Sequence, residues 1–155
     1  MVEIIHIGAM ELRFLHSKHD TGGMLDMFEM VLHPNAAMPV AHSHRDWEET
    51  IYGLSGVSRW TLDGTTLDLP AGESLFIPRG IVHGFDNKSG DVARCLVILT
   101  PGALGPDYFR EVAAAIPAEG PPDVARMREI MGRYGLIPAP PRPRPDQPSE
   151  NPGNG

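Results

Sequence analysis

Short runs of β-forming residues, each ended by a turn, fill residues 1–102 of the chain. The runs recur about every eight to twelve residues with Gly, Pro or Asp at the breaks, which is typical of an all-β sandwich or barrel and not of alternating β and α units. The clearest break is Asp63-Gly64, between the alternating runs 57–62 and 65–69. An Asp-Gly pair in this setting predicts a two-residue hairpin, because both central residues of a type I′ turn need a positive φ.

The pattern changes after Pro101-Gly102, where helical spacing replaces alternation. Residues 108–116 predict one helix, with Asp107 as its N-cap or first-turn acid, and a second helix begins at Asp123 and ends near Gly135. The residues that follow are rich in proline and poor in apolar side chains, so they cannot bury enough surface to fold by themselves. We therefore predict three regions: a β-barrel domain (1–102), a helical extension (103–135) and a flexible Pro-rich tail (136–155).

Charge and cysteine content limit the partners of the chain. Its 155 residues include 13 Lys and Arg against 20 Asp and Glu, and lysine occurs only at Lys18 and Lys88. Nucleic-acid binding needs clusters of basic side chains, so we expect no nucleic-acid partner. No apolar run approaches the roughly 20 residues that cross a bilayer, and no signal peptide is apparent, so we expect no membrane partner and a cytoplasmic location. The single cysteine, Cys95, lies in an apolar run and is predicted to be buried and unreactive.

Two histidines two positions apart, His42 and His44, predict the functional site. Alternate residues of a strand point to the same side, so the two imidazoles lie side by side. Glu48 and Glu49 follow closely, and His83 comes after a Pro-x-Gly turn on a later strand. Interior His and Glu side chains are costly to bury unless they are paired or bind a metal. Imidazole nitrogens with one carboxylate oxygen suit one divalent transition metal ion: Fe, Mn, Co, Ni, Cu or Zn.

These residues resemble the paired motifs of the cupin superfamily. The first motif is Gly, five residues, His-x-His, three or four residues, Glu, six residues and Gly. The second is Gly, five residues, Pro-x-Gly, two residues, His, three residues and Asn. The chain matches the first with His42, His44, Glu49 and Gly56, with Ala36 in place of the opening Gly, and the second with Gly72, Pro78, Gly80, His83 and Asn87. The resemblance implies a cupin fold, an RmlC-like jelly-roll β-barrel, here with a short helical C-terminal extension.

The resemblance also implies a ligand set for the metal. Counting back from Gly56 selects Glu49 rather than Glu48. Adjacent strand residues face opposite sides of a sheet, so the two glutamates cannot both point inward, and Glu48 is expected at the rim or surface. Asn87 is expected to bond the backbone of a turn. The implied metal ligands are His42, His44, Glu49 and His83.

Three functions are compatible with such a site. The ligand set, the small single barrel and the helical extension look most like quercetinase-like cupins, which implies a metal-dependent oxygenase acting on a small organic substrate, with Glu49 also as a catalytic base. One alternative is a non-oxidative isomerase or lyase of a small metabolite, in which the metal is a Lewis acid. The other is a cupin that binds a small molecule without turnover. Cupins often pair through edge strands, so we also expect a homodimer.

Other residues could contribute without being ligands. Methionines in residues 24–31 are predicted to pack in the core, with the lining of an apolar substrate cavity as the alternative. Trp60 is predicted in the core or a dimer interface. Arg79 and Tyr52 are possible pocket groups whose orientation the sequence does not indicate. The remaining histidines lack ligand spacing and are expected at the surface or in structural positions: His6, His16, His19 and His33.

Overall fold

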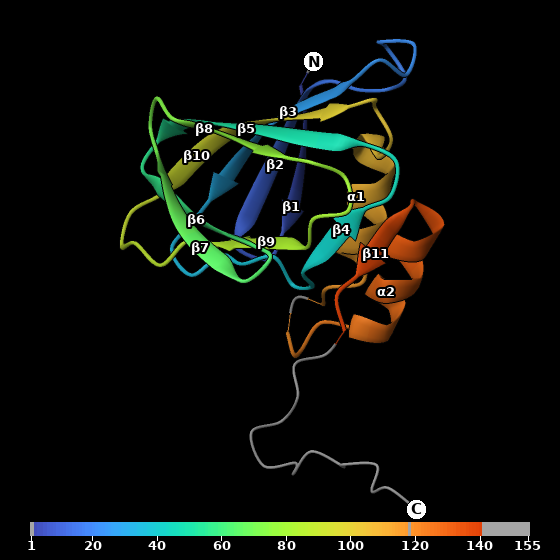
Figure 1. The fold of residues 1–155 in the computed structure, drawn as a ribbon. Helices are drawn as coiled ribbons and strands as arrows, with labels where there is room; N and C mark the ends of the chain where they lie inside the picture. Colours follow the sequence, from blue (N-terminus) through green and yellow to red (C-terminus); the bar gives the residue numbers. More distant parts are fainter. Residues whose placement is uncertain (1, 118, 141–155) are drawn as a thin grey trace, which may run out of the picture.

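Two antiparallel sheets face each other to form the barrel (Figure 1). The computed structural model describes residues 2–117 and 119–140. The first sheet has six strands, in the spatial order β1 (Glu3–Ile7), β2 (Met10–His16), β3 (Asp26–Leu32), β10 (Ala93–Thr100), β5 (Glu48–Ser55) and β8 (Ser74–Ile77). The second has five, in the order β11 (Leu136–Pro138), β4 (His42–His44), β9 (His83–Asp86), β6 (Val57–Leu62) and β7 (Thr65–Pro70). The predicted all-β barrel with a helical extension is confirmed.

The predicted hairpin lies between β6 and β7. Asp63 and Gly64 adopt φ values of 45° and 82°, as the type I′ geometry requires. The two strands then pair in register from Leu62 opposite Thr65. Trp60 on β6 is buried in the core, where its indole nitrogen donates a hydrogen bond to the Ser58 hydroxyl at 2.9 Å.

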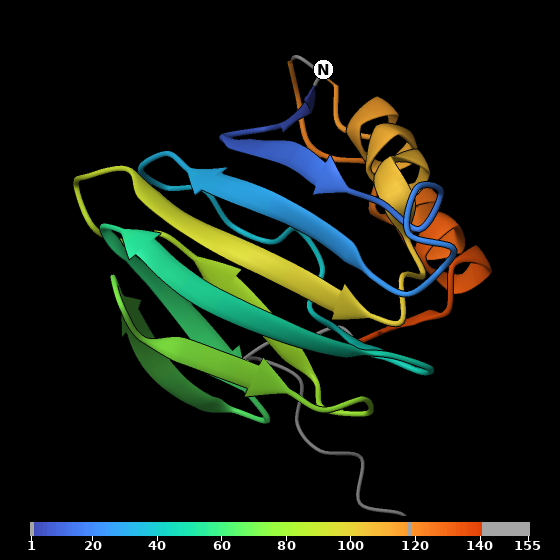
Figure 2. The same cartoon turned by 90° about the horizontal axis from the view of Figure 1, so that it is seen from above.

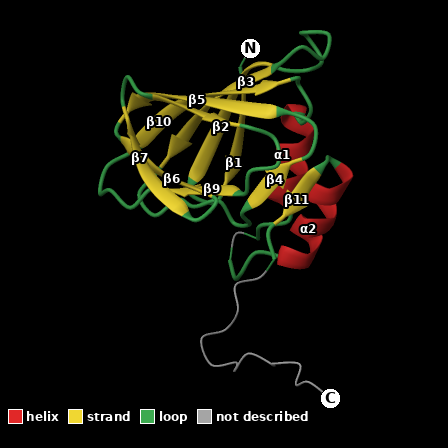
Figure 3. Cartoon of the chain, in the orientation of Figure 1, coloured by secondary structure: helices red, strands yellow, loops and turns green. Residues whose placement is uncertain are grey.

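Two helices follow the last barrel strand, α1 (Gly105–Ala114) and α2 (Val124–Arg133), and both lie at one side of the barrel (Figures 2 and 3). Helix α1 begins three residues before the predicted 108, because a buried carboxylate outside the helix holds its first turn. Asp26 accepts hydrogen bonds from the backbone nitrogens of Leu104, Gly105 and Lys18 at 3.0, 3.1 and 2.7 Å. Asp107 is a first-turn acid and not the N-cap. Among the described residues, no helix has the length and apolar character to cross a membrane.

The segment 136–138 corrects the prediction of a tail from residue 136. It forms strand β11, which pairs antiparallel with β4, Leu136 opposite His44 and Pro138 opposite His42. Leu136 is buried, so the neighbouring sheet supplies the apolar contacts that the segment cannot make by itself. The rest of the predicted tail, residues 141–155, lies outside the described residues.

Candidate metal centre

Three strands from both sheets bring the predicted ligands together. His42 and His44 lie on β4, and His83 is the first residue of β9, opposite His42 in the pairing of the two strands. One ring nitrogen from each histidine lies within 4.8 Å of the others. Glu49 comes from β5 in the facing sheet, and its Oε2 lies 3.3 Å from Nε2 of His83 and 3.6 Å from Nε2 of His44. The structure therefore places all four predicted ligands at one point inside the barrel.

Backbone carbonyls orient two of the three imidazoles. Nδ1 of His42 donates to the carbonyl of Val40 at 3.1 Å, and Nδ1 of His83 donates to the carbonyl of Ile81 at 2.9 Å. A carbonyl oxygen only accepts, so the proton of each neutral ring is on Nδ1 and the lone pair is on Nε2. Nε2 of His83 is buried and has no hydrogen-bond partner among the described residues. This is the arrangement expected of histidines that bind a metal through Nε2.

Burial controls the protonation of these histidines. Burial first, and then the charge of His83, lowers the pKa of His42 to about 3. Burial, followed by the charges of His42 and His83, lowers the pKa of His44 to about 2. Burial acts to lower the pKa of His83 as well, but the carboxylate of Glu49, whose Oε2 lies 3.3 Å from Nε2, outweighs it and raises the pKa. His42 and His44 are thus neutral at pH 7 and have lone pairs available for a metal.

The donor set fits a first-row divalent metal ion. Three imidazoles and one carboxylate are borderline ligands of the kind such ions take. Burying four polar side chains that make so few hydrogen bonds to the protein would cost free energy, and a cation between them would offset that cost. The residues His42, His44, His83 and Glu49 could therefore hold one metal ion.

Glu48 lies on the other side of β5 from the site. The guanidinium of Arg79 donates two hydrogen bonds to its carboxylate, at 2.6 and 2.9 Å. These hydrogen bonds, and then the positive charge of Arg79, lower the pKa of Glu48. Tyr52 on the same strand is exposed. Neither Arg79 nor Tyr52 lines the cavity beside the predicted ligands. The possible role of these two residues in the pocket is therefore excluded.

The turn residues of the second motif hold the strand of His83 in place. Gly80, at a φ of 85°, donates its backbone N–H to the carbonyl of His44 at 2.9 Å. Asn87 is buried, and its side-chain nitrogen donates to the carbonyls of Leu32 and Asp91 at 2.9 and 2.7 Å. Asn87 thus ties turns together and does not face the ligands. The histidines outside the site are exposed, as expected: His6, His16, His19 and His33.

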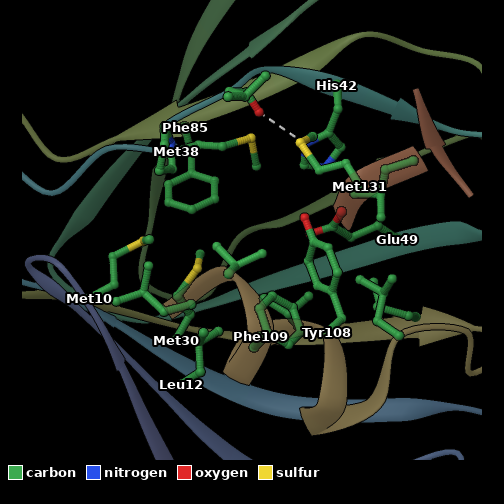
Figure 4. A pocket seen from close by; sticks show the side chains of 18 of the residues that line it. Met10, Leu12, Met30, Met38, His42, Glu49, Phe85, Tyr108, Phe109 and Met131 are labelled. Carbon is green, nitrogen blue, oxygen red and sulfur yellow. Dashed lines mark hydrogen bonds between the residues drawn. The ribbon is translucent and has the colours of Figure 1, made fainter. Parts of the chain in front are cut away.

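A largely apolar cavity of about 80 Å³ lies beside the predicted ligands. Figure 4 shows His42, Glu49 and the hydroxyl of Tyr108 toward one end, and Met10 and Met30 toward the other. The barrel and the helices both contribute apolar lining. The methionines that line it are Met10, Met30, Met38, Met127 and Met131, and the aromatic residues are Phe28, Phe85, Tyr108 and Phe109.

The sequence did not reveal that the C-terminal extension forms part of this cavity. Tyr108 and Val112 of α1 line it, as do Met127 and Met131 of α2. Helical spacing predicted that these side chains share apolar faces, but such a stripe does not say which surface it packs against. The sequence pattern also predicted no role for Trp47, although its ring stacks on His44 with centroids 4.6 Å apart. The only feature of the sequence that could have suggested this contact is that Trp47 comes three residues after His44, a predicted ligand.

Comparison with known proteins agrees with this geometry. Residues 28–99 match the family model described as Cupin domain. The polyketide cyclase RemF from Streptomyces resistomycificus is 32% identical, with a TM-score of 0.56, and the match covers 64% of this chain and 72% of RemF. A predicted oxalate decarboxylase from Thermotoga maritima is 22% identical, with a TM-score of 0.59 and coverage of 65% and 92%.

A third similar structure is that of a protein with a different activity. It is a sugar phosphate isomerase from a cupin superfamily of Silicibacter pomeroyi, 22% identical with a TM-score of 0.53. The match covers 61% of this chain, which spans only 60% of the isomerase. The comparison with curated proteins finds no match. The two motifs, the two-sheet barrel, the inward ligands and the matching family model lead to one conclusion: the chain belongs to the cupin superfamily.

Proposed function

We propose that the protein is a metal-dependent dioxygenase acting on a small, largely apolar substrate that has oxygen atoms at one end. The observation that carries the proposal is the position of His42, His44 and Glu49 at the polar end of an otherwise apolar cavity. A substrate in this cavity would place its apolar body among methionines and aromatic rings, and its oxygen atoms toward the ligands. Apolar walls also suit dioxygen, which is itself an apolar molecule.

The metal and the protein would have separate tasks. When bound, a redox-active ion such as iron, manganese, nickel, cobalt or copper would supply Lewis acidity and electron transfer to dioxygen. The three histidines would hold the ion. Glu49 would serve as a ligand and would accept a proton at its carboxylate from the oxygen-bearing end of the substrate. The apolar lining would exclude water from that end.

The cavity disfavours a phosphorylated substrate. Phosphate groups are bound by Arg, Lys or clusters of backbone N–H groups. No Lys or Arg lines the cavity among the described residues. The proposed substrate class therefore differs from that named for the sugar phosphate isomerase.

A second candidate is a non-oxidative ring closure or isomerisation, with the metal as Lewis acid only and zinc as a further suitable ion. One observation favours it: RemF, a polyketide cyclase, is 32% identical to this chain. Poly-carbonyl compounds have the same combination of apolar body and oxygen-bearing end that the cavity suits. Glu49 would again accept the proton.

One experiment separates these candidates. The metal of the purified protein is identified by elemental analysis, and the protein is incubated with flavonols, enediols, thiols and aromatic poly-carbonyl compounds, with and without dioxygen. A dioxygenase consumes dioxygen and, with isotope-labelled gas, places both oxygen atoms in the product. Equal turnover without dioxygen would overturn the first proposal in favour of the second. Binding without turnover under either condition would make the protein a binding cupin.

The cytoplasmic location and the homodimer stay predictions.

A further inference from the structure

Trp47 lies flat against one of the proposed metal ligands. Its ring and that of His44 have centroids 4.6 Å apart and planes inclined by 17°. Trp47 is only 1% exposed. It is not a ligand, and it does not line the cavity where a substrate would lie. Its contact with the site is therefore made through His44.

His44 differs from the other two histidines in how its ring is held. His42 and His83 each donate Nδ1–H to a backbone carbonyl. Nδ1 of His44 is buried and has no hydrogen-bond partner among the described residues. The plane of this imidazole is thus set by ring packing and not by a hydrogen bond, and Trp47 supplies a parallel surface.

The C-terminal extension supports Trp47 from behind. A Cβ added to Gly135 would lie 3.2 Å from Cζ3 of Trp47, so the indole packs closely on this glycine. Gly135 also accepts a backbone hydrogen bond from Arg45 at 3.2 Å. The next residue, Leu136, pairs with His44 in the second sheet. Gly135 and β11 thus hold the strand of His44 and the ring beside it.

We propose that Trp47 is the positioning residue of His44 and that the stack contributes directly to metal affinity. A metal ion draws electron density from the imidazole that binds it, and an electron-poor ring stacks more strongly on the electron-rich face of an indole. Metal binding therefore strengthens the stack. Because binding equilibria are reciprocal, the stack raises the metal affinity by the same factor.

The test measures Ni²⁺ affinity of the full chain by competition with a coloured chelator, together with the melting temperature of the metal-free protein. Trp47→Leu removes the aromatic face and is expected to weaken Ni²⁺ binding by a factor of about three to ten, the range for one aromatic pair. Trp47→Phe retains a ring, removes a buried N–H that has no partner among the described residues, and is expected to restore most of the affinity. Trp60→Leu is the matched control, because its indole is also fully buried but packs on Phe85 and not on a ligand.

A loss of affinity in Trp47→Leu that exceeds the loss in Trp60→Leu, with recovery in Trp47→Phe, supports the proposal. Equal losses in the two Leu variants, or no loss in Trp47→Leu, would overturn it, because the indole would then serve the fold alone.

A second pair of variants applies if Trp47→Leu does not fold. Gly135→Ala pushes on the indole, whereas Gly120→Ala introduces a side chain at a similar φ, 91° against 85°, with no atom within 4 Å. Only Gly135→Ala should weaken Ni²⁺ binding; equal affinities in both variants contradict the proposal. The inference rests on the metal site of the proposed function. If the unaltered protein binds no metal, both fail, whereas normal binding in every variant removes this inference alone.

Discussion

Glu48 and Glu49 are consecutive residues, but their carboxylates lie on opposite faces of β5. Oε2 of Glu49 is 3.3 Å from Nε2 of His83 inside the barrel. The carboxylate of Glu48 is bound by the guanidinium of Arg79 outside it, with a shortest distance of 2.6 Å. The two-residue period of a strand produces this separation, because successive side chains leave opposite faces. The same two residues thus provide a test of the metal site.

Glu49→Gln is expected to lower the affinity for Ni²⁺ by at least about tenfold, since loss of even an outer partner of a ligand costs that much. Glu48→Gln should leave the affinity unchanged, because it removes only an exposed ion pair with Arg79, and such pairs contribute little. Chelator competition measures both constants. The reverse order of effects would show that Glu48 is the ligand.

The metal-free protein is expected to lose stability on acidification. His42 and His44 have folded pKa values of about 3 and about 2, below the ordinary 6.5. As the pH falls below about 6.5 the unfolded chain binds protons that the folded protein does not, so the free energy of unfolding decreases, by up to about 1.4 kcal/mol per pH unit for each histidine. His83 acts in the opposite direction, since its pKa is raised.

Urea denaturation with a chelator present, from about pH 7 to about pH 4, measures this slope. The variant His42→Gln removes one of the two titrating groups and should have a shallower slope. A free energy of unfolding that does not change over this range would contradict the proposed neutrality of the buried histidines.

Tyr108→Phe is expected to lower kcat/KM for the substrate without changing the affinity for the metal. Burial raises the pKa of Tyr108, so its hydroxyl stays protonated and can donate a hydrogen bond to a substrate oxygen at the polar end of the cavity. Loss of one such bond corresponds to a decrease in kcat/KM of about three- to tenfold. Tyr134→Phe is the control, because Tyr134 does not line the cavity. Equal kcat/KM values for Tyr108→Phe and the unaltered protein would exclude this contact.

Asp26→Ala is expected to lower the free energy of unfolding by about 3 kcal/mol, because it leaves three backbone N–H groups without their acceptor. Asp123→Ala removes one capping bond, to the backbone of Arg126, and should cost only about 1 kcal/mol. Urea denaturation compares the two. A smaller loss for Asp26→Ala than for Asp123→Ala would mean that the first turn of α1 does not depend on this carboxylate.

Local chemistry explains which parts of the molecule were predictable. The turn at Asp63-Gly64 follows from backbone sterics, whereas the convergence of His42, His44, Glu49 and His83 was implied by the resemblance to the two cupin motifs. The turn depends only on neighbouring residues. The site was predictable because each of the two motifs has a characteristic spacing of residues along the chain.

Partners distant in sequence explain what was not predictable. Leu136-Ile137-Pro138 is too short to alternate and contains a proline, and it becomes a strand only because β4 offers an edge. Nothing in the sequence around Asp26, at the start of β3, indicates a special role. Its role at the start of α1 depends on hydrogen bonds from the backbone of Leu104 and Gly105, nearly eighty residues away. Such contacts leave no periodic signal.

The pairing of β11 with β4 has a consequence for the order of assembly. The segment that carries His42 and His44 emerges early during translation, whereas its outer neighbour in the sheet, residues 136–138, is made only after the whole barrel and both helices. Closing so long a loop is slow compared with forming a local hairpin. We expect a barrel in which residues 136–138 have not yet paired with β4 to bind metal weakly. High-affinity loading would then belong to the last stage of folding.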